Sequence, residues 1–343
     1  MVREYLDSWG RELAGSITPL TYDDVFHCRT LRTGTYIFSD VERLQPTDAE
    51  RAARVRAALS TAGHRVLNHP LRSMRRYELL RTLHREGLNQ FDVYRVRDNE
   101  RPRRFPVFLR IENDHGGSLT DLLPTPAALD DALRELRQRG QRNEDLLITE
   151  FCDTADHQGV HRKYSAFMIA GRIVPGHIFY AREWLVKFPV LLEPEMLAEE
   201  QRYVETNPHE EQLRAIFRLA RVDYGRIDYA MRDGTPQVWE LNTNPWIMSY
   251  RDVGSAQRLS ARVAVAAALR DAFGAIADDR APTRMTVPLQ AGVFDTWRPS
   301  WPTHCARALL RRTGLLWHEE TVRTALLRLR GRQPIPPVAS PPV

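Results

Sequence analysis

Lysine is nearly absent from this chain of 343 residues, because all but two of its 49 Lys and Arg residues are arginine. The exceptions are Lys163 and Lys187. Lysine supplies a compact point charge that the planar arginine fork does not, so both positions are informative. Cysteine is also scarce. Its three copies, Cys28, Cys152 and Cys305, are odd in number and widely spaced, which fits neither a disulfide framework nor a zinc site and predicts free thiols.

Long apolar runs are missing as well. No stretch reaches the roughly 18 apolar residues that a membrane-spanning helix needs. The first residues, MVREYLDSWGRELAG, carry charges throughout and lack the apolar core of a signal peptide, so we expect a cytoplasmic protein. The net charge of +5 is spread along the whole chain and forms no basic stripe. A non-catalytic nucleic-acid-binding protein is therefore the least favoured of the functions considered, and nucleic acid is not an expected partner.

The strongest local pattern is a hairpin within the stretch GRIDYAMRDGTPQVWELNTNP, residues 225–245. Two runs rich in β-branched, aromatic and apolar residues, 227–231 and 237–241, flank an Asp-Gly pair at 233–234. An Asp-Gly pair between such runs favours a tight turn. The sequence therefore predicts two antiparallel strands here.

Three oxygen-bearing side chains lie on these strands. Glu240 and Asn242 are two residues apart, so they leave the same face of an extended strand. A two-residue turn would set Asp228 opposite Trp239, whereas a three-residue loop that includes Thr235 would set it opposite Glu240. We expect the three-residue loop. Two carboxylates and an amide without His or Cys suit Mg²⁺, which usually shares its coordination shell with phosphates, so the hairpin predicts a magnesium–nucleotide site.

The order Arg-x-Asp, hairpin, Glu-x-Asn-x-Asn-Pro resembles the metal-binding hairpin of the ATP-grasp superfamily, which includes glutathione synthetases, D-alanine ligases and glutamate-adding ligases. The resemblance implies an ATP-grasp fold of mixed α+β and α/β type, in which two α+β halves clamp ATP. It also implies that Asp228, Glu240 and Asn242 hold Mg²⁺ ions on the ATP phosphates. Arg226 is the matching catalytic candidate.

The segment before the hairpin fits the same resemblance from residue 68 onward. An Asn-x-Pro stop at 68–70 and a basic helix at 72–86 come first, followed by strands at 92–96 and 106–111, a helix at 126–139 and a strand at 146–151. This β-β-α-β order resembles the small ATP lid. Family members often have a lysine in the basic helix, where this chain offers Arg75 or Arg76, and another on the second strand, where it has Arg110.

The resemblance also assigns the nucleotide contacts. Arg110 is the implied α/β-phosphate ligand, and His115, Gly116, Gly117 and Ser118 form the implied loop over the phosphates, where glycine lets backbone N–H groups approach an anion. Residues 148–153 resemble the hinge of the ATP cleft. There, Glu150, Phe151 and Cys152 are implied to meet the adenine and Asp153 the ribose.

Two more cations complete the expected site. Strands at 163–169 and 172–179 predict a hairpin that begins with Lys163, which either contacts the ATP phosphates or an acidic substrate, or is an exposed residue at a strand end. Arg182 stands where related ligases often keep an arginine that binds the acyl phosphate. Lys187 is expected to face solvent.

The predicted domain division has four parts. Residues 1–68 form an N-terminal domain with a helix at 5–13 and a β-α-β unit at 35–39, 46–62 and 65–67; residues 69–152 form the lid and 153–280 the second catalytic half, with helices at 193–203, 208–221 and 256–276; residues 281–343 form a helical extension with a Pro-rich tail. The basic amphipathic stretch at 309–329 could pack on the core, mediate association such as a homodimer, or lie on an anionic membrane surface.

The resemblance thus predicts an ATP- and Mg²⁺-dependent ligase that joins a carboxylate to an amine or thiol through an acyl phosphate and releases ADP and phosphate. An ATP-grasp kinase that acts on a hydroxyl or phosphate acceptor is the alternative. The identity of the substrates lies in loops that the motif does not specify.

Overall fold

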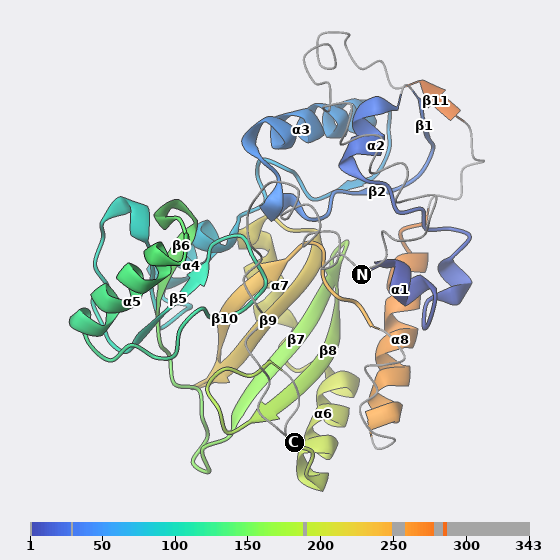
Figure 1. Ribbon diagram of the computed structural model, residues 1–343. Helices are drawn as coiled ribbons and strands as arrows, with labels where there is room; N and C mark the ends of the chain where they lie inside the picture. Colours follow the sequence, from blue (N-terminus) through green and yellow to red (C-terminus); the bar gives the residue numbers. More distant parts are fainter. Residues whose placement is uncertain (1, 29, 188–190, 249–257, 278–283, 287–343) are drawn as a thin grey trace. The chain divides into compact units, whose positions relative to one another are not determined.

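The computed structural model describes residues 2–28, 30–187, 191–248, 258–277 and 284–286, all within one compact unit, Met1–Leu289 (Figure 1). Cys305 and the predicted helix at 309–329 lie outside the described residues. Cys28 and Cys152 are free thiols, as predicted. None of the helices in the described ranges is long and apolar enough to cross a membrane.

The N-terminal part contains the predicted β-α-β unit. Strands β2 (Tyr36–Ile37) and β3 (Val66–Leu67) are parallel and are joined through helix α3 (Pro46–Thr61), which begins with a proline at its first turn, where a missing N–H costs nothing. The remaining elements here are α1 (Val2–Leu6), η1 (Arg11–Leu13), α2 (Tyr22–His27), β1 (Thr30–Arg32) and η2 (Val41–Arg43). Strand β1 pairs antiparallel with β11 (Arg284–Thr286), a pairing that the sequence pattern did not predict.

The single helix predicted at 5–13 is wrong. The chain leaves α1 after Leu6 and turns so that the amide of Gly10 donates to the carbonyl of Tyr5 at 2.8 Å. A Cβ atom at Gly10 would lie only 2.4 Å from Cε1 of the Tyr5 ring. Only glycine permits this close approach, and the turn replaces the middle of the predicted helix.

The next part confirms the predicted β-β-α-β order. After helix α4 (Arg76–Arg85), strands β4 (Val93–Arg95), β5 (Val107–Ile111) and β6 (Leu146–Glu150) form an antiparallel sheet in the order β4-β6-β5, with short turns η3 (Val96–Asp98) and η4 (Asn143–Asp145). Helix α5 (Pro126–Gln138) is capped by Thr125, whose hydroxyl accepts the amide of Ala128 at 3.2 Å. Leu129, Leu133 and Leu136 of α5 pack on the strands.

A four-stranded antiparallel sheet carries the rest of the fold (Figure 1). Its strands are β7 (His161–Ile169), β8 (Arg172–Ala181), β9 (Tyr224–Arg232) and β10 (Thr235–Asn242), in the order β10-β9-β7-β8. Helices α6 (Pro194–Thr206) and α7 (Glu210–Ala220) bury one set of alternating strand residues; Tyr164, Tyr229 and Val238 share a core with Tyr203 and Phe217.

Helix α8 (Leu259–Gly274) packs at the end of this sheet that holds the β7–β8 turn. There its Val265 and Leu269 form a second core with Phe167, Val174 and Tyr5. The predicted helix at 256–276 is therefore confirmed over most of its length. The mixed α/β architecture of two sheet-and-helix units, preceded by a small β-α-β unit, matches the predicted fold class.

Candidate active site

The register of the β9–β10 hairpin brings the two predicted acids together. Asp228 and Glu240 are direct cross-strand partners, and Asn242 pairs with Arg226. These residues share the sheet face that α6 and α7 do not cover, because Tyr229 and Val238 point into the helix-covered core. The predicted pairing of Asp228 with Glu240 is confirmed.

The three-residue loop from which this pairing was predicted is wrong. Thr235 pairs with Arg232, so the turn holds only two residues, Asp233 and Gly234, with φ angles of 50° and 73°. The pairing instead shifts by one residue between Val238 and Glu240, where Trp239 forms a β-bulge. The Trp239 ring stacks on Phe91 with 4.8 Å between the ring centroids, which anchors the extra residue.

Glu240 is held by cations from α4, from β5 and from the segment after β5. Its Oε2 accepts hydrogen bonds from Arg110 at 2.8 Å and from Arg76, while its Oε1 lies 3.7 Å from Nδ1 of His115. Burial alone would raise the pKa of Glu240, but Arg76, His115 and Arg110 outweigh it and hold that pKa well below its usual range. Burial and the neighbouring Arg76 lower the pKa of Arg110 to about 10, against the pull of Glu240. Both groups remain charged at neutral pH.

Arg76 is a site residue that the sequence left undecided between positions 75 and 76. Besides Glu240, its guanidinium donates to the carbonyls of Ile111 at 2.9 Å, Glu112 at 2.8 Å and Asp114 at 2.6 Å. Arg75 points elsewhere and donates to the carbonyl of Leu44 at 3.0 Å. Arg76 therefore links residues 111–114, which lead into the glycine loop at residues 115–118, to the β9–β10 hairpin.

Asp228 is bound by cations from the sheet. Arg226 donates to it through Nε at 2.8 Å and Nη2 at 3.2 Å, and the ammonium of Lys163 lies 3.9 Å from its Oδ2. Lys163 is mostly covered and lies 5.4 Å from the centroid of the Phe179 ring. The structure thus brings Lys163 and Arg226, two predicted catalytic residues, to a predicted metal ligand.

The third predicted ligand, Asn242, accepts the amide of Asn244 at 2.7 Å through Oδ1. The next residue ties the hairpin to the N-terminal part, because Thr243 donates its amide at 3.0 Å and its hydroxyl to the buried carboxylate of Glu42. Glu42 also lies 3.3 Å from Nε2 of His115. The sequence carries no local signal for Glu42, whose partners are about 70 and 200 residues away.

His115 therefore stands between two carboxylates. Burial lowers its pKa, but Glu240 and Glu42 act in the opposite direction, and the net effect is a raised pKa. Burial raises the pKa of Glu42, whereas His115 and Thr243 lower it, with a lowered pKa as the result. The carboxylates and the imidazole stabilise one another in their charged forms.

The other residues of the predicted loop are Gly116, Gly117 and Ser118. The backbones of Ser118 and Arg110 form an isolated antiparallel β-bridge. The Oγ of Ser118 donates to the carbonyls of Leu109 at 3.2 Å and Thr120 at 2.6 Å. Gly117 has a φ of 91°, and a Cβ atom there would lie 2.9 Å from Cε and 3.3 Å from Nζ of Lys187. Gly116 lies beside the Asp114 carboxylate, 3.4 Å from where a Cβ would stand.

Lys187 is exposed, as expected, yet its end lies over the glycine loop. The sequence signal that singled out Lys187 was the near absence of lysine from the chain. Lys163 and Lys187, the two lysines of the sequence, stand at Asp228 and at Gly117 respectively.

The predicted hinge residues are Glu150, which ends β6, and the three residues that follow it. Glu150 is buried, and its carboxylate accepts hydrogen bonds from Tyr94 Oη at 2.9 Å and Arg104 Nη2 at 2.9 Å. Burial raises the pKa of Glu150, but Arg104 and Tyr94 outweigh it and the net pKa is lowered. The amide of Phe151 donates to the carbonyl of Pro106 at 3.0 Å. The Glu150 side chain and the Phe151 amide thus already have partners within the lid.

The next two residues differ in exposure. Cys152 is buried, with Sγ 3.8 Å from Oε1 of Gln237, and burial raises the pKa of its thiol. Asp153 is exposed, and its carbonyl accepts Nη1 of Arg232 at 3.1 Å. Asp153 also lines a cavity of about 420 Å³ together with Asp156, Arg162 and Tyr164. Tyr164 points into the core under α6 and α7, so this cavity lies on the sheet face opposite the hairpin acids.

Arg182 is not with the other catalytic candidates. It is exposed and donates to the carbonyl of Gln158 at 3.0 Å. It follows Ala181, which pairs with His161, whereas Asp228 pairs with Ser165, four residues further along β7. That spacing corresponds to roughly 13 Å along a strand.

The donor set suits a hard cation. Within the described ranges, no three His, Cys, Asp or Glu residues gather as a metal site, and the hairpin offers two carboxylates with the Asn242 amide. Oε1 of Glu240 has His115 at 3.7 Å and Oδ1 of Asn242 accepts one amide, so both oxygens retain lone pairs for a ligand. These oxygens fit Mg²⁺.

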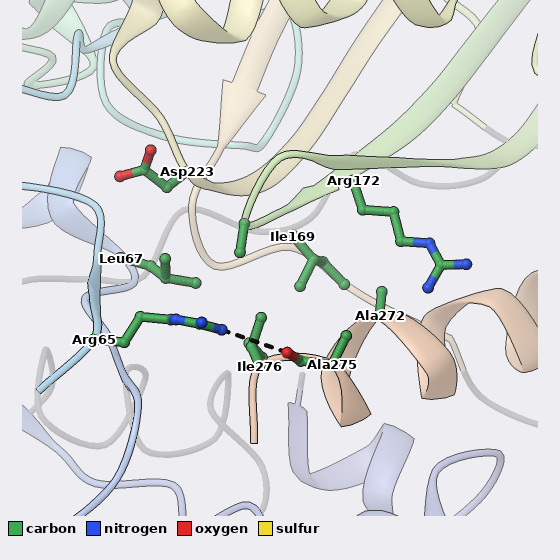
Figure 2. Close-up of a pocket in the computed structure, with 9 residues that line it drawn as sticks. Arg65, Leu67, Ile169, Arg172, Asp223, Ala272, Ala275 and Ile276 are labelled. Carbon is green, nitrogen blue, oxygen red and sulfur yellow. Dashed lines mark hydrogen bonds between the residues drawn. The ribbon is translucent and has the colours of Figure 1, made fainter. Parts of the chain in front are cut away.

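A second cavity lies away from the hairpin acids (Figure 2). It measures about 430 Å³ and has an apolar floor that includes Leu67, Ile169 and Ile276. Arg65 and Arg172 stand at its rim, and Arg65 donates to the carbonyl of Ala275 at 3.4 Å (Figure 2). None of the predicted site residues lines this cavity.

Of the comparisons with known proteins, only the one with solved structures gives matches. No protein-family model matches the chain, and no curated protein matches it. The chain is similar to ligases of known structure. D-alanine–D-alanine ligase from Bacillus anthracis, complexed with ATP, matches 64% of this chain and 76% of its own at 15% identity and a TM-score of 0.37.

Two further matches have comparable scores. L-amino acid ligase from Bacillus licheniformis shares 16% identity over 61% of this chain and 47% of its own, with a TM-score of 0.35. D-alanine–D-alanine ligase from Helicobacter pylori shares 14% over 64% and 69%, also with a TM-score of 0.35. The resemblance of this chain to the ATP-grasp superfamily rests on its hairpin motif and on the β-β-α-β order of residues 92–151.

Proposed function

We propose that the protein is an ATP- and Mg²⁺-dependent ligase that joins a carboxylate to an amine or thiol through an acyl phosphate and releases ADP and phosphate. One observation carries the proposal. Asp228 and Glu240 are cross-strand partners with Asn242 on the same face, and cations from separate elements surround the two acids. Those cations are Arg76 of α4, Arg110 of β5, Lys163 of β7 and Arg226 of β9.

Asp228, Glu240 and Asn242 would hold the Mg²⁺. A bound Mg²⁺ supplies charge neutralisation where the γ-phosphoryl group leaves ATP. ATP itself would lie between the lid and the four-stranded sheet, with its adenine near Glu150, Phe151 and Cys152 and its ribose near Asp153.

The chain's own cations would then divide the work. Arg110 and Arg76 from the lid neutralise phosphate oxygens, and Lys187 with the loop His115, Gly116, Gly117 and Ser118 covers the phosphates from above. Lys163 and Arg226 stand on the sheet side, where the carboxylate substrate becomes phosphorylated. Arg182 lies at the hinge end of the sheet, so the role implied by the resemblance requires it to leave the Gln158 carbonyl.

No covalent enzyme intermediate is needed in this scheme. The buried Cys152 has a raised thiol pKa, which makes it a poor nucleophile at neutral pH. The acyl phosphate would hydrolyse in water, so exclusion of water by the glycine loop is the second task of the lid. Arg76 serves that task because it fastens residues 111–114 to Glu240.

Product analysis tests the proposal. With a panel of carboxylates and amines, we expect ADP and phosphate in a one-to-one ratio with amide, and turnover that stops without Mg²⁺. Glu240→Gln should lower kcat by about 100-fold or more, because a lost transition-state contact of this kind commonly costs a few kcal/mol. Glu135→Gln, an exposed change on the surface of α5, is the matched control and should keep full activity.

The other outcomes separate the alternatives. AMP and pyrophosphate as products, or full activity in Glu240→Gln, would contradict the mechanism. A phosphorylated hydroxyl or phosphate acceptor with no amide would show the kinase alternative. Nucleic-acid binding without any ATP turnover would show the non-catalytic one.

A further inference from the structure

His177 lies on the same sheet face as the hairpin acids but has no role in the scheme above. It stands on β8 directly opposite Ser165 of β7, and Ser165 in turn is opposite Asp228 of β9. The imidazole is half-buried and stacks on Phe179 with 3.8 Å between the ring centroids and 15° between the planes. Lys163, whose ammonium is 5.4 Å from the Phe179 centroid, is on the same side of the sheet.

The hydrogen bonds of Ser165 fix the tautomer of this imidazole. Ser165 Oγ accepts the backbone amide of His177 at 3.1 Å and lies 3.0 Å from Nδ1 of the same residue. Ser165 is fully buried, and its hydroxyl has no other acceptor among the described residues. The hydroxyl hydrogen therefore goes to Nδ1, so Nδ1 is the acceptor and Nε2 carries the ring proton.

The local backbone is built for this contact. A Cβ atom at Gly176 would lie 2.4 Å from Ser165 Oγ, so glycine is required beside the serine. The strand pairing also shifts between Ser165 and Ala166, next to the contact. Such bulges re-aim side chains near functional sites.

The surroundings keep the imidazole uncharged. Burial lowers the pKa of His177 well below its usual value, and the cations Arg262, Arg226, Lys163 and Arg258 act in the same direction. Nε2 has no hydrogen-bond partner among the described residues. The result is a neutral N–H donor beside four cations, two of them paired with Asp228 and two with Glu200, and a neutral donor of this kind suits an anionic oxygen.

We propose that His177 donates Nε2–H to an oxygen of the acceptor carboxylate, or of the phosphorylated carboxylate, and forms an oxyanion subsite with Lys163 and Arg226. The inference rests on the proposed function and names the side of the sheet that binds the acceptor. Arg226 and Lys163 both contact Asp228, so this subsite adjoins the place of phosphoryl transfer. His177 extends it towards β8, away from the lid.

Calorimetric titration of inorganic phosphate into the full chain, saturated with Mg²⁺ and ADP, tests the subsite. His177→Phe keeps an aromatic ring to stack on Phe179 but removes the donor, and His177→Gln keeps an N–H donor without the ring. We expect His177→Phe to weaken phosphate binding by about tenfold or more, as for a hydrogen bond to a charged group, with an unchanged dissociation constant for ADP. His177→Gln should stay within about threefold of the wild type.

The outcomes separate this inference from the proposed function. Equal phosphate affinity in His177→Phe and wild type, or an equal loss in both variants, would overturn the subsite, since the second result assigns the effect to ring packing. Binding of ADP without any phosphate binding also overturns the subsite but leaves the ligase proposal standing. Failure of the wild type to bind ADP with Mg²⁺ would defeat the proposed function itself.

An independent measurement observes the protonation of the imidazole directly. Long-range ¹H–¹⁵N spectra of the ¹⁵N-labelled protein report which nitrogen of each histidine is protonated. The resonances of His177, assigned by their absence from His177→Gln, should show protonated Nε2 and bare Nδ1. In Ser165→Ala this tautomer should lose its preference. A protonated Nδ1 in the wild type would overturn the inference.

Discussion

Several carboxylates in the interior of the described part of the chain accept hydrogen bonds from arginine. Glu112 accepts Nε of Arg95 at 2.9 Å, Glu150 accepts Arg104, Glu200 accepts Arg258 and Glu240 accepts Arg110. An arginine stays charged even when buried and offers a planar fork of donors, so it can satisfy both oxygens of a carboxylate. The scarcity of lysine in the sequence thus has a counterpart in the core.

Glu240 should make the stability of the metal-free protein depend on pH. Its pKa is held well below the usual value, mainly by Arg76 against the effect of burial, so its stabilising contribution is complete above the ordinary Glu pKa of about 4.3. That contribution is lost as the pH falls from there towards the depressed value. Glu240→Gln should therefore be less stable at neutral pH, and its deficit should shrink as the solution becomes more acidic.

Urea denaturation in EDTA at a series of pH values between about 3 and 7 measures this effect. At neutral pH we expect a loss of about 3–5 kcal/mol, because Arg76 and Arg110 are left buried without their counter-charge. Glu135→Gln is the control and should follow the wild-type curve. A deficit that is constant across the pH range would contradict the assignment.

The β9–β10 hairpin shows how a single element decides the geometry of the candidate site. Its Asp-Gly turn sets the pairing of the first residues, and the bulge at Trp239 then brings Glu240 opposite Asp228. A second constraint lies at its start. A Cβ atom at Gly225 would be 2.8 Å from the carbonyl oxygen of Asn242 and 3.1 Å from Leu241 Cδ2. The strands can be this close only because residue 225 has no side chain.

Gly225→Ala should therefore destabilise the protein by about 1–3 kcal/mol, since the methyl group must push the backbone at Asn242 aside. It should also weaken Mg²⁺-dependent ADP binding, because Asn242 is a proposed ligand. Gly15→Ala is the matched control, as a Cβ atom there meets nothing within 4 Å. Urea denaturation and calorimetry measure the two effects. Equal stability of the two variants would show that the hairpin tolerates the added methyl group.

Across the whole described unit, one buried ion cluster joins elements that are distant in the sequence. Glu200 of α6 accepts Nη2 of Arg258 and lies 3.3 Å from Nη2 of Arg262 of α8. It also accepts the amide of Ile178 on β8 at 3.3 Å. The cluster thus links α8 and α6 to the outer strand of the large sheet, next to the proposed oxyanion subsite.

Removal of the Glu200 charge at the centre of this cluster should lower the free energy of unfolding. Glu200→Gln leaves two buried guanidinium groups without their partner, and we expect a loss of about 3–5 kcal/mol in unfolding free energy. Glu195→Gln, an exposed change on the same helix, should cost less than about 0.5 kcal/mol. Chemical denaturation of the two variants decides the matter. A loss below about 1 kcal/mol for Glu200→Gln would mean that the cluster is replaceable by neutral hydrogen bonds.

Much of the element order followed from the sequence alone. Strands with alternating apolar residues, the β-α-β unit, the lid order and the Asp-Gly turn are each encoded by neighbouring residues, and the structure confirms them. The failures are also local in origin. The prediction of a helix at 5–13 did not take Gly10 into account. The prediction of the hairpin loop did not take the bulge at Trp239 into account.

What the tertiary structure alone decided is which distant residues meet. Glu42 reaches Thr243, Arg76 reaches Glu240, and β1 pairs with β11, yet none of these pairs is near in sequence. The four-part domain division and the assigned roles of the site residues remain predictions. Periodicity and turn chemistry depend on adjacent residues, so a sequence displays them. The partners of a buried charge depend on how separate segments pack, and only the folded chain brings those segments together.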